Sequence, residues 1–266
     1  MHQLTVDKLS YILKGTIELN ITMESAKKKF VSTHLIVSIG IALLVFLAVF
    51  FYWYPAPLDK ATGVTHIFLM LLGIDLILGP ALTWLVYKEG KKSLKFDLTV
   101  IILIQISALC YGVYHIVQGR PAWMVYSVDR FDLIKNNEIY TKNTKEAAKE
   151  FQQPSWLEPQ YAAIQFSLDS KQKNQDMFDE ILGGVEISQR PERYVDFAQA
   201  KEHIQKRAQS LDLLQQYNDK AAVEKTLAKY PQATAFLPMK ASSVDMTVLI
   251  NHQGEVVKIV DLRPWQ

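Results

Sequence analysis

One acidic side chain interrupts an otherwise apolar stretch of this sequence. Asp75 is the only formally charged residue in the 23 residues from Thr65 to Tyr87. If this run crosses a bilayer, the carboxyl group lies near the midplane, where a charged group costs about 2.5–3.5 kcal/mol on insertion scales. Ionisable groups at that depth often mark functional sites, so Asp75 is the first candidate site residue.

Three roles for Asp75 differ in what they require. A proton or ion relay needs further ionisable groups in register, and the run supplies only Asp75, so transport is not expected. A hydrogen bond to Ser107 or Tyr111 on the neighbouring helix would give Asp75 a purely structural role. Such bonds between membrane helices stabilise the protein by about 0.6 kcal/mol on average. A polar or charged group on a partner helix would offset the insertion cost better.

The residues around Asp75 suit helix contact. Pro80 removes a helix hydrogen bond and bends the span, which exposes the carbonyl near Leu76. Gly73 and Gly79 allow another helix to approach closely.

Three long apolar runs, at 35–54, 65–87 and 98–117, must position these residues. A span needs about 20 mostly apolar residues to cross a hydrocarbon core of roughly 30 Å. Three buried helices of a soluble protein are the alternative, but such helices usually show a polar face, which the first run lacks. We therefore predict three transmembrane helices in a membrane domain over 23–118, followed by an α+β domain over 119–266.

Lysines flank the runs unevenly. Three precede the first run at 27–29, and four lie in the loop between the second and third runs, whereas the loop between the first and second has only Lys60, offset by Asp59. Lys and Arg favour the cytoplasmic side of short loops. The pattern predicts a cytoplasmic N-terminus and an exported C-terminal domain. The single cysteine, Cys110, allows no intrachain disulfide, which fits a bacterial periplasm.

Residues 1–22 are too polar to span and too short to fold alone. One interpretation is a non-native or unstructured extension, with translation starting at Met23. The other is a short amphipathic helix on the membrane surface.

The exported part shows mixed helix and strand patterns. The expected elements are a strand at 122–134, a helix at 143–151, a strand at 161–168, helices at 170–184, 198–218 and 219–231, and a hairpin at 244–262 that turns at Gly254.

No motif in this part indicates catalysis. It has no nucleophile elbow, P-loop or glycine fingerprint, and its histidines, His203 and His252, lie far apart without a matching carboxylate motif. We therefore expect no enzyme activity, no metal, no cofactor and no nucleic-acid partner. Lys91 and Lys92 are placed to touch anionic lipid headgroups.

Three blocks of the sequence resemble the TfpX/TfpZ family of type IV pilin accessory proteins. They are WYPAPLDKATGVTHIFLMLLGIDLILGPALTWLVYKEGKKSLKFDLTVI, ALCYGVYHIVQGRPAWMVYSVDRF and FLPMKASSVDMTVLINHQGEVVKIVDLRPW. The resemblance covers residues 23 to the C-terminus. It implies a multi-pass inner-membrane protein of a Gram-negative bacterium, with a periplasmic domain, that helps its cognate major pilin to assemble into pili.

The resemblance and the residues together give two groups of site residues. The predicted partner-binding residues are His66, Asp75, Leu76, Gly79 and Pro80. The motif residues expected to act structurally are Lys91, Lys92, Arg120, Pro121, Asp129 and Arg130. For the last four, fold-orienting roles are favoured over binding, and Asp129 and Arg130, as strand neighbours, should point to opposite faces.

The expected partners are the major type IV pilin, inner-membrane pilus assembly proteins and membrane lipid. Two other functions stay open: a membrane sensor with a periplasmic ligand-binding domain, and a pilin-modifying membrane enzyme. The oligomeric state is left open.

Overall fold

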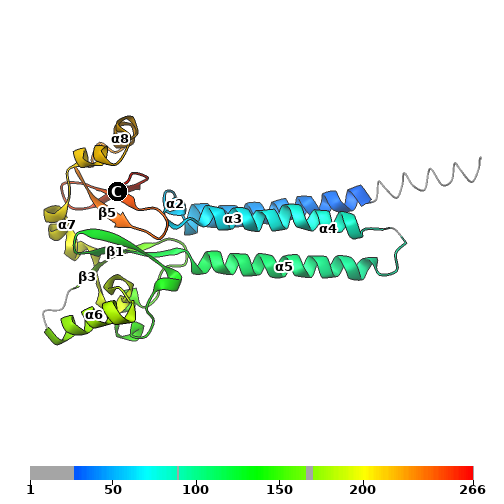
Figure 1. Cartoon of the computed structure of the whole chain (residues 1–266), viewed down its shortest axis with the longest axis horizontal. Helices are drawn as coiled ribbons and strands as arrows, with labels where there is room; N and C mark the ends of the chain where they lie inside the picture. Colours follow the sequence, from blue (N-terminus) through cyan, green and yellow to red (C-terminus); the bar gives the residue numbers. More distant parts are fainter. Residues whose placement is uncertain (1–26, 89, 166–169, 266) are drawn as a thin grey trace, which may run out of the picture. The chain divides into compact units, whose positions relative to one another are not determined.

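The computed structural model describes residues 27–88, 90–165 and 170–265 (Figure 1). The prediction for residues 1–22 lies outside this range. The chain divides into two compact units. The helical unit comprises Met1–Phe46 and Ile67–Tyr114, and the C-terminal unit comprises Leu47–His66 and His115–Gln266.

Three long helices in the described residues are apolar and long enough to cross a membrane: Lys27–Trp53, Val64–Val86 and Leu94–Gln118. The first ends in a π-helical segment, η1 (Ala48–Trp53). The second consists of α3 (Val64–Gly73), η2 (Ile74–Leu78) and α4 (Gly79–Val86), and the third is α5 (Leu94–Gln118). Most of their apolar side chains are exposed, as expected for helices that lipid would surround.

The π-helical segment η2 lies immediately before Gly79 and Pro80. Proline has no N–H to donate to the carbonyl four residues earlier, at Leu76, and its ring crowds that carbonyl. A π turn changes the hydrogen-bonding pattern at this point, and such bulges are frequent at functional sites. Asp75 lies within this segment.

The described part of the C-terminal unit contains a mixed seven-stranded sheet with the order β4-β3-β1-β2-β5-β6-β7. Its strands are β1 (Pro121–Ser127), β2 (Arg130–Lys135), β3 (Gln160–Ile164), β4 (Tyr194–Val195), β5 (Ala235–Lys240), β6 (Met246–Ile250) and β7 (Val256–Val260). The pairs β1·β3 and β2·β5 are parallel, and the others are antiparallel. Three helices accompany the sheet: α6 (Ser170–Gly183), α7 (Lys201–Arg207) and α8 (Lys220–Leu227).

Strand β6 shows how the sheet is covered on both faces. Its alternate residues Val248 and Leu249 point to opposite sides and join different clusters of buried side chains. Ile204 of α7 belongs to the cluster with Val248, and Val223 of α8 to the cluster with Leu249. All five residues of β6 are therefore buried.

The connection between the first two long helices packs into the C-terminal unit. It contains the short helix α2 (Leu58–Thr62), whose Leu58 and Ala61 lie in the same buried cluster as the strand residues. The Ala61 carbonyl accepts hydrogen bonds from the backbone N–H groups of Ser243 and Val244. This connection is thus part of the core of the C-terminal unit.

Several expectations for the C-terminal unit were wrong. Residues 122–134 form two antiparallel strands, because Val128 and Asp129 turn the chain between the paired residues Ser127 and Arg130. Asp129 is therefore a turn residue. The expected helix at 143–151 is two 3₁₀ turns, Thr144–Glu146 and Lys149–Phe151. The region 198–218 is helical only in pieces: η8 (Phe197–Ala200), α7 and η9 (Leu211–Gln216). Strand β5 was not predicted.

Other expectations were confirmed. The helix at 170–184 is α6 and the helix that follows Asp219 is α8, where the Asp219 carboxylate accepts a 3.0 Å hydrogen bond from the Ala222 N–H. The C-terminal hairpin is β6 and β7, with Gly254 at φ 74°. Residues 166–169 of the expected strand at 161–168 lie outside the described residues, and β3 ends at Ile164.

Candidate functional site

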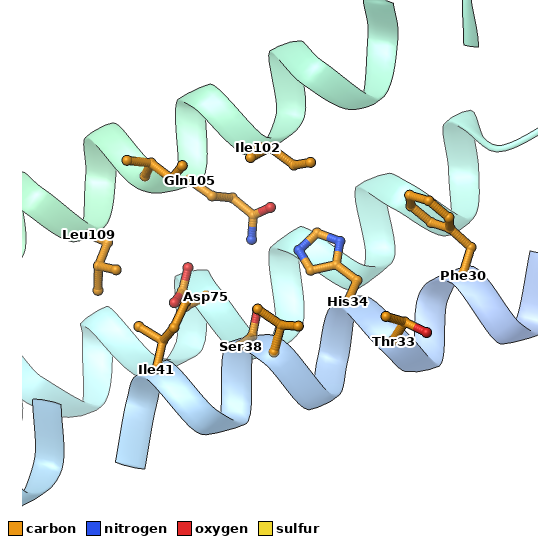
Figure 2. A pocket seen from close by; sticks show the side chains of 11 residues that line it. Phe30, Thr33, His34, Ser38, Ile41, Asp75, Ile102, Gln105 and Leu109 are labelled. Carbon is orange, nitrogen blue, oxygen red and sulfur yellow. The ribbon is translucent and has the colours of Figure 1, made fainter. Parts of the chain in front are cut away.

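A groove of about 280 Å³ lies within the helical unit and contains Asp75 (Figure 2). The first helix and α5 form its two walls, and Asp75 comes from the second helix. The lining residues are Phe30, Thr33, His34, Val37, Ser38, Ile41, Asp75, Ile102, Gln105, Ile106 and Leu109. Those on each wall recur at three- and four-residue spacing, so each wall is one face of a helix. The groove is mostly apolar, with a few polar groups inside.

Asp75 is 93% buried, with only 7% of its surface exposed. Figure 2 shows its carboxylate directed toward the wall that carries Gln105 and Leu109. Within the described part of the chain, no side chain donates a hydrogen bond to this carboxylate, although His34 lies close enough to interact with it electrostatically. Buried carboxylates usually have hydrogen-bond partners, so Asp75 is exceptional.

His34 contacts both the groove and the second helix. Its Nδ1 lies 2.9 Å from the Thr83 hydroxyl, in α4, two turns after Asp75. Which of the two atoms donates depends on the imidazole tautomer. This bond orients the ring, which Figure 2 shows pointing into the groove toward Gln105.

Gln105 is the second buried polar group without a full set of partners. It is 8% exposed, and its Oε1 has no hydrogen-bond partner among the described residues. Its amide lies against Gly79: a Cβ added there would be 1.8 Å from Gln105 Nε2. Gly79 is therefore required for the amide to reach this position.

The predicted partner-binding residues are only partly brought together. Asp75 lines the groove, and Gly79 and Pro80 are buried beside it, with Gly79 against Gln105. Leu76 is half-buried and does not line the groove, and His66 is exposed in the first turn of α3.

The alternative in which Ser107 or Tyr111 hydrogen-bonds Asp75 finds no support in the described residues. Both side chains are exposed, and neither lines the groove. His34 and Gln105 take that place and were not predicted as site residues. The only signal for Gln105 was an amide side chain within an uncharged apolar run, and its helical face could not be assigned without the fold.

The basic motif residues of the connecting loop lie at the surface. Lys91 Nζ lies 2.8 Å from Asp97 Oδ2, and Lys92 is exposed.

The motif residues around β1 serve the C-terminal unit. Arg120 is buried, with its guanidinium 5.4 Å from the ring centroid of Trp156, and Pro121 is buried at the start of β1. The Arg130 Nε donates a 2.8 Å hydrogen bond to Asp132, whose pKa is raised because burial disfavours its charged form. Asp129 is exposed.

Within the described residues, no group of three His, Cys, Asp or Glu side chains could hold a metal ion. The polar groups of the groove can instead accept or donate hydrogen bonds to a group brought from outside.

Comparison with known proteins identifies relatives of the chain. The family model described as "Fimbrial assembly protein FimB" matches residues 25–63. The fimbrial assembly protein of serogroup I from Dichelobacter nodosus is 28% identical over 248 residues, which cover 90% of this chain and 96% of the relative. The protein of serogroups C1 and C2 from the same organism is 34% identical over 113 residues, covering 42% of this chain and 86% of the relative. No solved structure matches the chain.

Proposed function

We propose that this chain, which belongs to the FimB family of fimbrial assembly proteins, is an inner-membrane protein that binds its cognate major type IV pilin and promotes pilin stability or assembly into pili. The names of the relatives support the role in assembly. The closer assignment to the TfpX/TfpZ accessory proteins rests on the three sequence blocks. The observation that carries the binding role is the groove with its unpaired Asp75 and Gln105.

The groove fits an apolar helix that carries a polar group. Its apolar wall residues, such as Val37, Ile102 and Ile106, are partly exposed and would accept either lipid tails or a helix. Lipid tails offer nothing to Asp75 or Gln105, and unsatisfied polar groups are costly in a medium of low polarity. A helix with a polar side chain or an amine would fill the apolar walls and satisfy the polar groups.

The pilin has the required chemistry. Before assembly, a type IV pilin is held in the membrane by its apolar N-terminal helix, which carries a glutamate near its start and, after processing, a free amine. In this proposal Asp75 pairs with the amine or shares a proton with the glutamate. Asp75 lies 12 residues from Tyr87, about 18 Å along the helix. The processed amine of a pilin lies near the cytoplasmic interface, so the bound pilin helix would be displaced toward the periplasm.

The proposed membrane topology places each of the other parts of the chain on one side of the membrane. The N-terminus is cytoplasmic, the lysine-rich loop at 88–97 is cytoplasmic, and the C-terminal unit is periplasmic, where it would contact the pilin head and set specificity. Other inner-membrane assembly proteins are further partners. The role is binding without catalysis, metal or cofactor.

Capture of the pilin from membranes tests this function. We expect tagged wild-type protein to retain the major pilin after mild detergent extraction, and Asp75→Ala at equal abundance to lose most of it, with fewer surface pili. Ser107→Ala, on the exposed side of α5, is the matched control and should behave as wild type. Normal pilin capture and pilus yield by Asp75→Ala would contradict the proposal.

A further inference from the structure

A short loop of the C-terminal unit presents two large apolar side chains to the exterior. Trp156 is 65% exposed and Leu157 is 59% exposed, in a segment bounded by Pro154 and Pro159. The loop has internal order, because the Leu157 N–H donates to the Ser155 hydroxyl at 3.3 Å. Contiguous exposed apolar side chains mark surfaces that contact a membrane or a partner, and these two begin such a patch.

Contacts inside the C-terminal unit place this loop beside the ends of two long apolar helices. The Trp156 ring lies 6.4 Å from the Trp53 ring, measured between centroids. Trp53 is the last residue of the first long apolar helix. The Arg120 guanidinium also lies near the Trp156 ring, and Arg120 follows the end of α5 by two residues. Trp156 therefore lies at the level where two long apolar helices end.

A hydrogen bond holds these two helix ends together. The Tyr54 hydroxyl donates a 2.6 Å hydrogen bond to the Ile116 carbonyl, which ties the residue after the first helix to the last turns of α5. Phe51 and Tyr52, in the last turn of the first helix, are also exposed. Exposed aromatic side chains thus gather at one level, on the helix end and on the loop.

Aromatic side chains at the ends of membrane spans prefer the boundary between hydrocarbon and headgroups, where an apolar ring and a polar N–H or O–H are both accommodated. We infer that the loop 154–159 is a lipid-binding anchor, in which Trp156 and Leu157 insert into the interfacial layer of the leaflet next to the C-terminal unit. Continuity with Trp53 and Tyr52 favours lipid as the occupant. The inference rests on the proposed membrane spans and is independent of pilin binding.

The anchor gives the C-terminal unit an attachment to the bilayer besides its helices. Arg120 is buried under Trp156, so it supports the ring rather than contacting headgroups. Glu158, the next residue after Leu157, is exposed and would stay on the aqueous side. The loop would thereby limit tilting of the C-terminal unit on the membrane surface.

Site-specific quenching tests the anchor. The full chain with Cys110→Ala receives one bimane label at Leu157→Cys and is reconstituted into phosphatidylcholine vesicles with or without brominated acyl chains. Ile104→Cys, exposed in the middle of α5, is the control for the span. Asp129→Cys is the aqueous control, since it lies in the turn beyond the far end of β1, a strand that rises roughly 20 Å from Pro121 to Ser127 at 3.3 Å per residue.

We expect brominated lipid to quench the Leu157 and Ile104 labels and to leave the Asp129 label unchanged, whereas aqueous iodide quenches only the Asp129 label strongly. A Leu157 label that behaves like the Asp129 label would overturn the inference. A Leu157 label shielded from both quenchers would also overturn it, because protein would then cover the loop. An Ile104 label that lipid does not quench would refute the spans themselves, which is a separate failure.

Discussion

Two buried aspartates, one in each unit, are held in different ways. Asp132 in β2 is 4% exposed and accepts a 2.8 Å hydrogen bond from Arg130. Asp75 is almost as buried, yet no described side chain donates a hydrogen bond to it. A buried carboxylate with a partner is part of the architecture, whereas one without a partner in an open groove is suited to a group from outside.

The two units also differ in how far they bury their own apolar side chains. The C-terminal unit buries its apolar residues against its own strands and helices, as β6 shows. The long helices leave most of their apolar surface exposed. Such exposure is typical of helices that lipid surrounds, and the proposed pilin helix would cover the groove. The comparison predicts that buried residues of the C-terminal unit serve stability, and that buried polar residues of the helical unit serve binding.

The largest expected effect concerns the connection that joins the core of the C-terminal unit. Leu58→Ala should lower the free energy of unfolding of that unit by about 2–5 kcal/mol, because it leaves a cavity beside Ala61. Thermal unfolding of the full chain in detergent, with protease resistance of the C-terminal unit, measures this. Lys60→Ala removes a surface ion pair to Asp261 and should cost less than about 1 kcal/mol. Equal effects of both variants would show that the connection is not a core element.

Asp75→Leu should separate stability from function. The substitution removes a polar group from an apolar site, so the helical unit should become more stable, by up to about 2.5–3.5 kcal/mol on insertion scales. Unfolding of the helices in mixed micelles with increasing SDS measures this, and pilin capture should fall at the same time. If Asp75→Leu instead makes the helical unit less stable, Asp75 has a structural role within that unit, and the contrast with Asp132 disappears.

A pair of glycine variants tests whether the position of Gln105 matters. Gly79→Ala should displace the Gln105 amide and weaken pilin capture roughly fivefold, the effect of one lost hydrogen bond of about 1 kcal/mol. Gly73→Ala, in the same helix, meets no atom within 4 Å and should have no effect. Pulldown of pilin from membranes with equal amounts of each variant makes the comparison. Indistinguishable capture by the two variants would exclude Gln105 from the binding site.

The smallest effect concerns the partnered carboxylate. Burial raises the folded-state pKa of Asp132 above its usual value near 3.8, so its contribution to stability is present below that pH and is lost as pH rises through the raised pKa. Asp132→Asn should therefore gain thermal stability relative to wild type as pH increases from 4 to 7. A relative loss over this range would mean that the bond to Arg130 outweighs the cost of burial.

The sequence pattern alone predicted the apolar helices and Asp75 as a candidate site residue, because a single charge in a 23-residue apolar run can be recognised without a structure. The pattern could not predict the groove. Whether His34 and Gln105 face Asp75 depends on how each of the three helices is rotated about its axis. The turn at Val128 and Asp129 was missed because it lacks the glycine or asparagine that usually marks a hairpin. The region 143–151 has helical composition, but Ala147 and Phe151 pack into the cluster around Trp123, and burial there overrides helix propensity.

Photocrosslinking from the wall of the groove tests the central claim most directly. A photoreactive residue at Ile106, which lines the groove, is compared in native membranes with one at Ile104, two positions away and outside it. We expect a pilin adduct from position 106, none from position 104, and loss of the adduct with Asp75→Ala. Equal adducts from both positions, or adducts from the C-terminal unit alone, would contradict the groove as the pilin-binding site.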